Sequence, residues 1–214
     1  MTGPRKTGPV RSRFVGEMKG ETKMRNAGNS GATQRVLGFF YNEVSMYIIT
    51  DIERLTNEIR PDPITNLGGC TVPLAMMLFT VLDLFGFLCR DDNNPRKSDT
   101  LGNFRYILSS KANFFQKEYE DNCEKIVKLF RHGIMHQFFC KASGISKAGL
   151  NSPLVFQSEG LYVLNVDILS KDVQKVLYAI KQTIEGNKDP DLAERINSRL
   201  DLLAREDYET LMSL

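Results

Sequence analysis

The sequence predicts a mainly α-helical bundle with one small β-hairpin near residues 154–166. Three observations indicate this fold class. Apolar residues recur every three to four positions in several segments, which is the period of a helix that buries one face. One further segment is apolar all round, as expected of a central helix. A single stretch combines two short β-prone runs with a turn between them.

Residues 1–33 are predicted to be a disordered basic tail, and residues 34–214 a single helical domain. The first 35 residues hold eight Lys and Arg against two Asp and Glu, whereas the remaining 20 basic and 24 acidic residues give the rest a net charge of −4. The tail is rich in glycine and has almost no large apolar residues, so burial cannot offset its ordering entropy. Three interpretations stay open: an arm that attracts phosphate backbones, a solvated leader, or an upstream start with the true one at Met18 or Met24. Because the tail lacks the continuous apolar core of a secretory signal, we expect a cytoplasmic protein.

The first element of the domain is expected to be a long amphipathic helix from Gln34 to Arg60. Pro61 and Pro63 end it, because proline cannot continue a helix. The apolar residues that recur with a helical period and define its buried face are Leu37, Tyr41, Val44, Ile48, Ile52, Leu55 and Ile59.

The apolar run from Val72 to Cys89, which Pro73 opens, is predicted to be the buried central helix. Its length would just allow it to span a membrane, but Asp83 lies in its second half, and an unpaired carboxylate is costly in lipid. We therefore expect no membrane association. Asp83 is the only charged residue of this run, so its carboxylate needs a buried partner, and Arg131 is a candidate.

The rest of the chain is predicted from the same signals. A loop-like stretch, residues 141–153, separates the helices from the hairpin "LVFQSEGLYVLNVDIL". The remaining helices are expected at residues 101–110, at 118–139, at 171–184 and, after Asp189 and Pro190, at 192–212.

The helix at residues 118–139 contains both histidines of the chain, directly after Arg131. On a helical wheel Arg131 lies at the edge of the apolar face, while His132 and His136 lie on the back together with Met135 and Phe139. A helix whose outer side becomes apolar near one end is covered there by another part of the chain or by a second subunit. The residues of the predicted core face are Tyr119, Cys123, Ile126, Val127, Phe130, Ile134 and Phe138.

Three interpretations of the histidines stay open. In the first they are ordinary hydrogen-bonded residues. In the second they bind a metal, but His132, His136 and Cys140 span about 12 Å along a helix, too far for one ion, so we expect no metal and no cofactor. The four cysteines are widely spaced and form no zinc or redox motif either.

In the third interpretation Arg131 and His136 act together on RNA. Arginine grips a phosphate with two hydrogen bonds, and histidine transfers a proton near neutral pH. These are the two functions that cleavage by the 2′-hydroxyl of RNA requires. Side chains five residues apart point about 140° away from each other on a helix, so both reach one substrate only in a cleft that wraps the helix end. A twofold dimer joined there would supply such a cleft.

The segment "RHGIMH" resembles the R-x4-6-H motif of the HEPN superfamily, a group of helical proteins that includes ribonuclease toxins and antiviral effectors. The resemblance implies that Arg131 and His136 are the catalytic pair and that His132 is a polar auxiliary. It also implies a homodimer in which the two motif helices face each other, an RNA substrate, and an antitoxin or other regulatory protein as a further partner. Asp83 would then support the site structurally.

Two functions therefore follow from the sequence. The first is a metal-independent endoribonuclease of HEPN type that acts in defence or as a toxin. The alternative is a non-catalytic α-helical dimerisation, adaptor or RNA-binding module, in which the motif residues only hold an interface together.

Overall fold

The computed structural model describes residues 31–64, 68–92, 99–109, 112, 114–137, 143–147, 151–156 and 161–212, without the side chains of 136, 137, 155, 156 and 206–212. Of the tail predicted for residues 1–33, residues 1–30 lie outside the described residues. Residues 31–33 already belong to the first helix, and Thr33 is buried.

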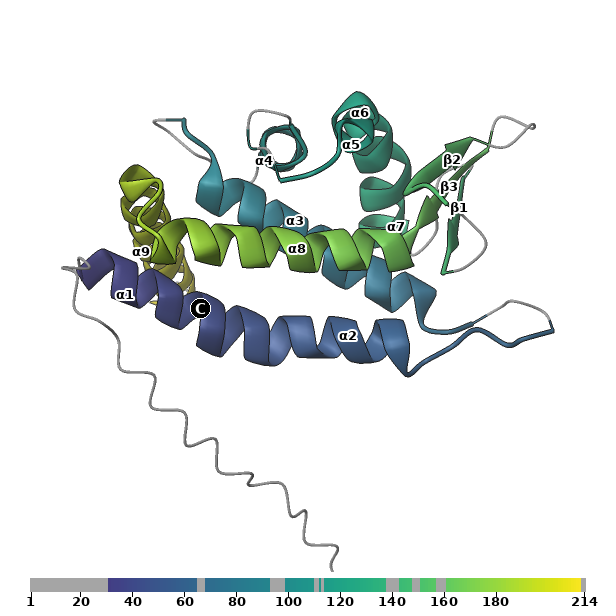
Figure 1. Ribbon diagram of the computed structural model, residues 1–214, viewed down its shortest axis with the longest axis horizontal. Helices are drawn as coiled ribbons and strands as arrows, with labels where there is room; N and C mark the ends of the chain where they lie inside the picture. Colours follow the sequence, from purple (N-terminus) through teal and green to yellow (C-terminus); the bar gives the residue numbers. More distant parts are fainter. Residues whose placement is uncertain are drawn as a thin grey trace, which may run out of the picture.

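The structure confirms a mainly α-helical fold with a small hairpin (Figure 1). The first long helix consists of α1 (Gly31–Gly38), the π-helical segment η1 (Phe39–Ile49) and α2 (Thr50–Asn57), which follow one another without a break. In the view of Figure 1 this helix lies below α8 (Val166–Glu185), with α9 (Pro190–Met212) at one end and the strands at the other.

The π-helical segment changes which residues of the first helix are buried. Val44 and Ile49, five residues apart, both lie in the core, as the i→i+5 spacing of a π-helix allows. Tyr41, which the regular helical period places on the buried face, is 44% exposed instead. Ile59 is also exposed, because α2 ends two residues before it.

Helix α3 (Thr71–Cys89) is the centre of the fold, as predicted. It contacts α2, α7, α8 and α9, and packs most extensively on α4 (Thr100–Ile107). By length and composition α3 is apolar enough to cross a membrane, yet most of it is buried inside the protein. The contact with α4 is close, because Gly86 lies directly against the backbone of Asn103.

The long helix predicted for residues 118–139 is divided into several segments in the structure. These are α5 (Lys117–Asp121), α6 (Cys123–Lys125), the π-helical segment η2 (Ile126–Arg131) and α7 (His132–Gln137). Despite the divisions, all members of the predicted core face up to Ile134 are buried. Phe138 lies outside the described residues.

The sheet is larger than the predicted hairpin. Strands β2 (Leu154–Phe156) and β3 (Tyr162–Asn165) pair antiparallel and form the hairpin, but β1 (Ser143–Ser146) also pairs with β3, in parallel. The glycine and serine of β1 resemble a loop in composition, so the strand is recognisable only by its partner. The predicted extension of the hairpin beyond Asn165 is wrong, because the Asn165 side chain accepts hydrogen bonds from two backbone N–H groups and starts α8 there.

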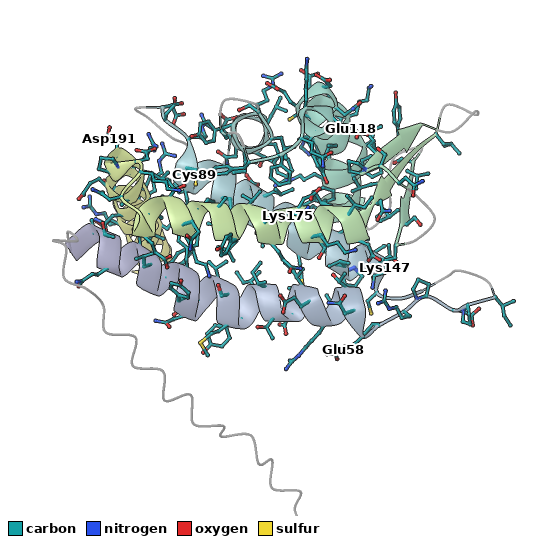
Figure 2. The ribbon with its side chains drawn as sticks, in the orientation of Figure 1. Glu58, Cys89, Glu118, Lys147, Lys175 and Asp191 are labelled. Atoms are coloured by element: carbon teal, nitrogen blue, oxygen red, sulfur yellow. The ribbon has the colours of Figure 1, made fainter. Side chains whose placement is uncertain are left out.

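Lys147 ties the end of β1 to the end of α2. Its side chain is almost fully buried, and its Nζ donates to the carbonyl oxygens of Leu55 and, at 2.8 Å, of Ile59. Figure 2 labels Lys147 near Glu58, where the helix ends. A cation there satisfies carbonyl groups that have no partner within the helix. Burial lowers the pKa of this amine below its ordinary value.

Gly86 provides a test of the α3–α4 contact. A Cβ at Gly86 would lie 2.6 Å from the carbonyl carbon of Asn103, so Gly86→Ala must push α3 and α4 apart. We expect a loss of about 1–3 kcal/mol in the free energy of unfolding, measured by urea denaturation. Gly38→Ala is the matched control, because no atom of the described residues lies within 4 Å of its Cβ position and alanine favours the helix. Equal stability of the two variants would contradict this account of the packing.

Candidate functional site

Asp83 and Arg131 form an ion pair between the central helix α3 and the motif helix, which is the continuous segment of η2 and α7. Arg131 Nη2 donates to Asp83 Oδ2 at 3.3 Å, and the two side chains are only 18% and 20% exposed. The same carboxylate accepts hydrogen bonds from Thr100 Oγ1 at 3.0 Å and from Asn103 Nδ2 at 2.8 Å. The prediction that Asp83 is paired inside the protein, with Arg131 as its partner, is confirmed.

Three local features bring these side chains together. Asp99 caps the start of α4 by accepting the N–H of Gly102, which places Thr100 and Asn103 in the first turn, opposite Asp83. The second feature is the close contact at Gly86. The third is the π-helical turn before Arg131, in which the N–H of His132 donates to the carbonyl oxygen of Val127, five residues earlier. The additional residue in this turn rotates the side chains on either side of it relative to a regular helix.

A pocket of about 200 Å³ lies beside the ion pair. Asp83, Asn103 and Arg131 contribute polar atoms to its wall. Asn103 is fully buried and uses both ends of its amide, since Nδ2 donates to Asp83 and Oδ1 accepts from Arg90 Nη1 at 3.0 Å. The remaining wall is mostly apolar and is formed by Phe79, Leu84, Phe87 and Met135 together with Thr80.

The two histidines follow Arg131 on α7. His132 is half-buried and takes part in interactions within the protein. His136 belongs to the last turn of α7, one and a half turns beyond Arg131, and its side chain lies outside the described part. The structure thus brings Arg131 and Asp83 together, while the predicted pairing of Arg131 with His136 stays a prediction.

Sequence reasoning missed Thr100, Asn103 and Arg90 as members of this network. A usable signal was present, because Asp99 followed by Thr100 is a typical helix start and places the next polar residues one turn later. The sequence does not show which other element packs against that helix. Only the packing of α4 on α3 shows that these polar residues meet Asp83.

Two buried thiols offer no nucleophile. Burial raises the pKa of Cys89 to about 12 and that of Cys123 to about 11, so both stay protonated at neutral pH. Within the described ranges, no group of three or more His, Cys, Asp or Glu residues is placed to hold a metal ion.

Comparisons of the chain with protein-family models, with curated proteins and with solved structures yield no match. The HEPN resemblance therefore rests on the residues of the motif, Arg131 to His136, as it did in the sequence. The ion pair of Asp83 and Arg131 beside the pocket is observed in the structure and does not depend on that resemblance.

A double-mutant cycle tests the strength of the ion pair. We expect Asp83→Asn and Arg131→Gln each to destabilise the protein, because each leaves the partner's charge partly buried and unpaired. The coupling between them should be about 1–3 kcal/mol in the free energy of unfolding, measured by urea denaturation. The exposed pair Asp51 and Arg54 on α2 is the control and should show a much smaller coupling. Additive effects of Asp83→Asn and Arg131→Gln would show that the contact does not stabilise the fold.

Proposed function

We propose that the chain is a metal-independent endoribonuclease of HEPN type, with Arg131 and His136 as its catalytic pair. The observation that supports it best is the position of Arg131. Its guanidinium is held by a carboxylate from the central helix, borders a pocket, and lies directly before the helix that carries His136. A fixed cation at the edge of a pocket is what stabilisation of a phosphoryl transition state requires.

Asp83 is a positioning residue in this proposal. Arginine carries five N–H donors, and the contact with Asp83 involves Nη2. Hydrogen bonds from Thr100 and Asn103 keep the carboxylate in place, so the orientation of the guanidinium is set before substrate binds. The other N–H groups of Arg131 then donate hydrogen bonds to the oxygens of the scissile phosphate. Such preorganisation avoids an ordering cost during the reaction.

The chemistry is an internal transesterification followed by product release. The 2′-hydroxyl loses its proton and its oxygen attacks the adjacent phosphorus, while the bond from phosphorus to the 5′-oxygen breaks and that oxygen gains a proton. His136 is the group that transfers protons, and Arg131 stabilises the additional negative charge on the phosphate. The products are a 2′,3′-cyclic phosphate and a 5′-hydroxyl end. No step uses a metal ion.

A homodimer through the motif helix is part of the proposal. Arg131 and His136 point about 140° apart on a regular α-helix, so one substrate contacts both only if a second surface closes over the end of α7. A second copy of this helix, related by a twofold axis, supplies that surface with the same residues. Roles in defence or in a toxin–antitoxin pair, with a regulatory protein partner, rest on the resemblance alone.

A non-catalytic adaptor or RNA-binding module is the second candidate, and one observation favours it. The charge of Arg131 is already compensated by Asp83, and the part of the chain after Arg35 has a net charge of −4. In that case the ion pair is a structural link between α3 and the motif helix. Cleavage assays separate the two candidates.

The first prediction from this proposal concerns cleavage. The purified full chain, incubated with total RNA in EDTA, should produce fragments that end in a 2′,3′-cyclic phosphate. His136→Ala should slow this by about 10²- to 10⁴-fold, because it removes the positioned proton transfer. Arg131→Lys should also lose activity, since a point ammonium cannot reproduce the two-bond grip on phosphate.

Matched variants serve as controls for these losses. His132→Ala removes the other histidine and should do less harm, and Arg54→Lys changes an exposed arginine on α2 and should have no effect. If His136→Ala cleaves as fast as the wild type, or if the wild type cleaves no RNA when its cognate substrate is supplied, the adaptor function replaces the enzyme.

The second prediction concerns assembly. Light scattering coupled to size-exclusion chromatography should give twice the chain mass of 24.3 kDa at micromolar concentration. Met135→Glu should lower the dimer fraction, because it adds a charge to the half-buried side of α7. A monomer at that concentration would exclude a stable dimer and with it the two-helix cleft.

A further inference from the structure

A second pocket, of about 390 Å³, lies between α9 and the segment that follows α3. It is larger than the pocket beside Arg131 and falls within the usual range for small-molecule sites, about 300–1,000 Å³. Figure 1 shows α9 at the end of the molecule away from the sheet, and Figure 2 labels Cys89 of α3 on that side. Its wall includes three arginines and one serine, all from α9: Arg195, Ser198, Arg199 and Arg205.

The two acidic residues of this pocket already have cations of their own. Asp201 Oδ1 accepts a hydrogen bond from Arg35 Nη1 at 2.5 Å. Asp92 forms ion pairs with Arg90 and with Arg199, the latter at 3.0 Å. Because Arg35 and Arg90 stand outside the pocket wall, the acids inside it do not cancel the charge of the other arginines that face it.

Arg199 is the pocket arginine that contacts within the protein hold in place. Its side chain is 4% exposed, its Nη1 donates to the carbonyl oxygen of Phe87, and its guanidinium lies 5.6 Å from the centre of the Phe87 ring. Burial lowers the pKa of Arg199 below its ordinary value, and the nearby cations Arg195 and Arg90 lower it further, against the opposing charge of Asp92. Arg199 is thus a buried cation whose charge Asp92 offsets, and it holds its position at the wall of the pocket.

Two other donors of the pocket have no partner among the residues that the structure describes. Arg195 Nε is buried and has no hydrogen-bond partner in the described part of the chain, although Nη2 of the same side chain lies 3.6 Å from Asp189. Among the described residues, Arg205 is exposed and forms no hydrogen bond or ion pair. A buried donor without a partner costs about 1–3 kcal/mol, so a conformation of Arg195 that meets an anion would be favoured.

The shape and charge of the pocket select one class of anion. Arg195, Arg205 and the hydroxyl of Ser198 offer donors to the oxygens of a phosphate, which arginine binds with two hydrogen bonds, while the buried Arg199 adds its charge. A terminal phosphate carries nearly two charges at neutral pH, whereas a phosphodiester in a nucleic-acid strand carries one. The surrounding net charge of −4 after Arg35 repels an extended polyanion but is outweighed locally for a compact one.

The geometry points to a binding site for the terminal phosphate of a small molecule, such as a nucleoside monophosphate, in this arginine pocket, linked to Arg131 by a chain of polar contacts. The link runs from Asp92 to Arg90, from Arg90 to Asn103 at 3.0 Å, and from Asn103 to Asp83 at 2.8 Å. Asp83 then accepts from Arg131. This site does not depend on whether the protein cleaves RNA.

Calorimetric titration of the full chain at low ionic strength tests the binding site. The probes are inorganic phosphate, a nucleoside 5′-monophosphate, the same nucleoside without phosphate, and a short 2′-O-methylated single strand with hydroxyl ends, which cannot be cleaved by its own 2′-oxygen. The two phosphate probes should bind saturably at one site per chain, and the nucleoside should not bind. Arg205→Gln should weaken binding by about tenfold, the loss of one charge-assisted hydrogen bond.

Arg54→Gln is the matched control, because it removes an exposed arginine of α2 outside the pocket wall, and it should leave binding unchanged. The site is overturned if the wild type shows no saturable phosphate binding, or if Arg205→Gln binds as tightly as the wild type. Equal or tighter binding of the methylated strand, weakened by the same variant, would overturn the terminal phosphate in favour of a nucleic-acid backbone.

The link to Arg131 has a separate readout, nuclear magnetic resonance of the arginine Nε–H groups. Titration with inorganic phosphate should shift the Arg131 signal along the same binding curve as those of Arg195 and Arg199, and should leave the Arg54 signal in place. In Arg205→Gln the Arg131 shift should move to about tenfold higher phosphate together with the pocket signals, whereas phosphate bound directly at Arg131 would be unaffected by that variant. Binding that shifts only the pocket arginines would overturn the link and leave the phosphate site standing. Neither the calorimetric result nor the resonance shift depends on RNA cleavage. Failure of the phosphate site and failure of the endoribonuclease proposal can therefore be told apart.

Discussion

The carboxylate of Asp83 is the constraint on which the central part of the structure depends. A charge on an otherwise apolar helix is costly to bury unless donors surround it. Here α4 supplies Thr100 and Asn103, and the motif helix supplies Arg131. One carboxylate thereby specifies how two further elements must sit against α3, whereas apolar contacts alone tolerate many arrangements.

The polar contacts of Asp83 continue toward the far end of α3. Asn103 accepts from Arg90, and Arg90 in turn pairs with Asp92 and, at 2.8 Å, with Asp99. Each acid along this line is matched by a cation or an amide, as a partly buried network requires. The same network that stabilises the packing of α3 therefore runs from one pocket to the other, which makes a structural role and a functional role for these residues compatible.

Much of the fold was predictable because it depends on local pattern. The apolar run of α3, the Asp189–Pro190 start of α9 and the core face from Tyr119 to Ile134 follow from residue type and spacing. The π-helical segments were not predictable, because an i→i+5 turn has no distinct residue signature and is favoured by the elements against which the helix packs. Strand β1 was missed for a related reason, since its hydrogen-bond partner β3 lies some twenty residues away in the sequence.

The sequence by itself determined the helical fold class, the burial of α3, the need of Asp83 for a partner and the presence of the Arg131–His136 motif. These are consequences of hydrophobic periodicity and of the cost of a buried charge, both of which act within one segment. Only the tertiary structure decided that Thr100 and Asn103 join Arg131 as partners, and that Arg195, Arg199 and Arg205 form a pocket with Asp92. The physical reason is that contacts between elements depend on how the helices pack in space, and the spacing of residues within each helix does not specify that packing.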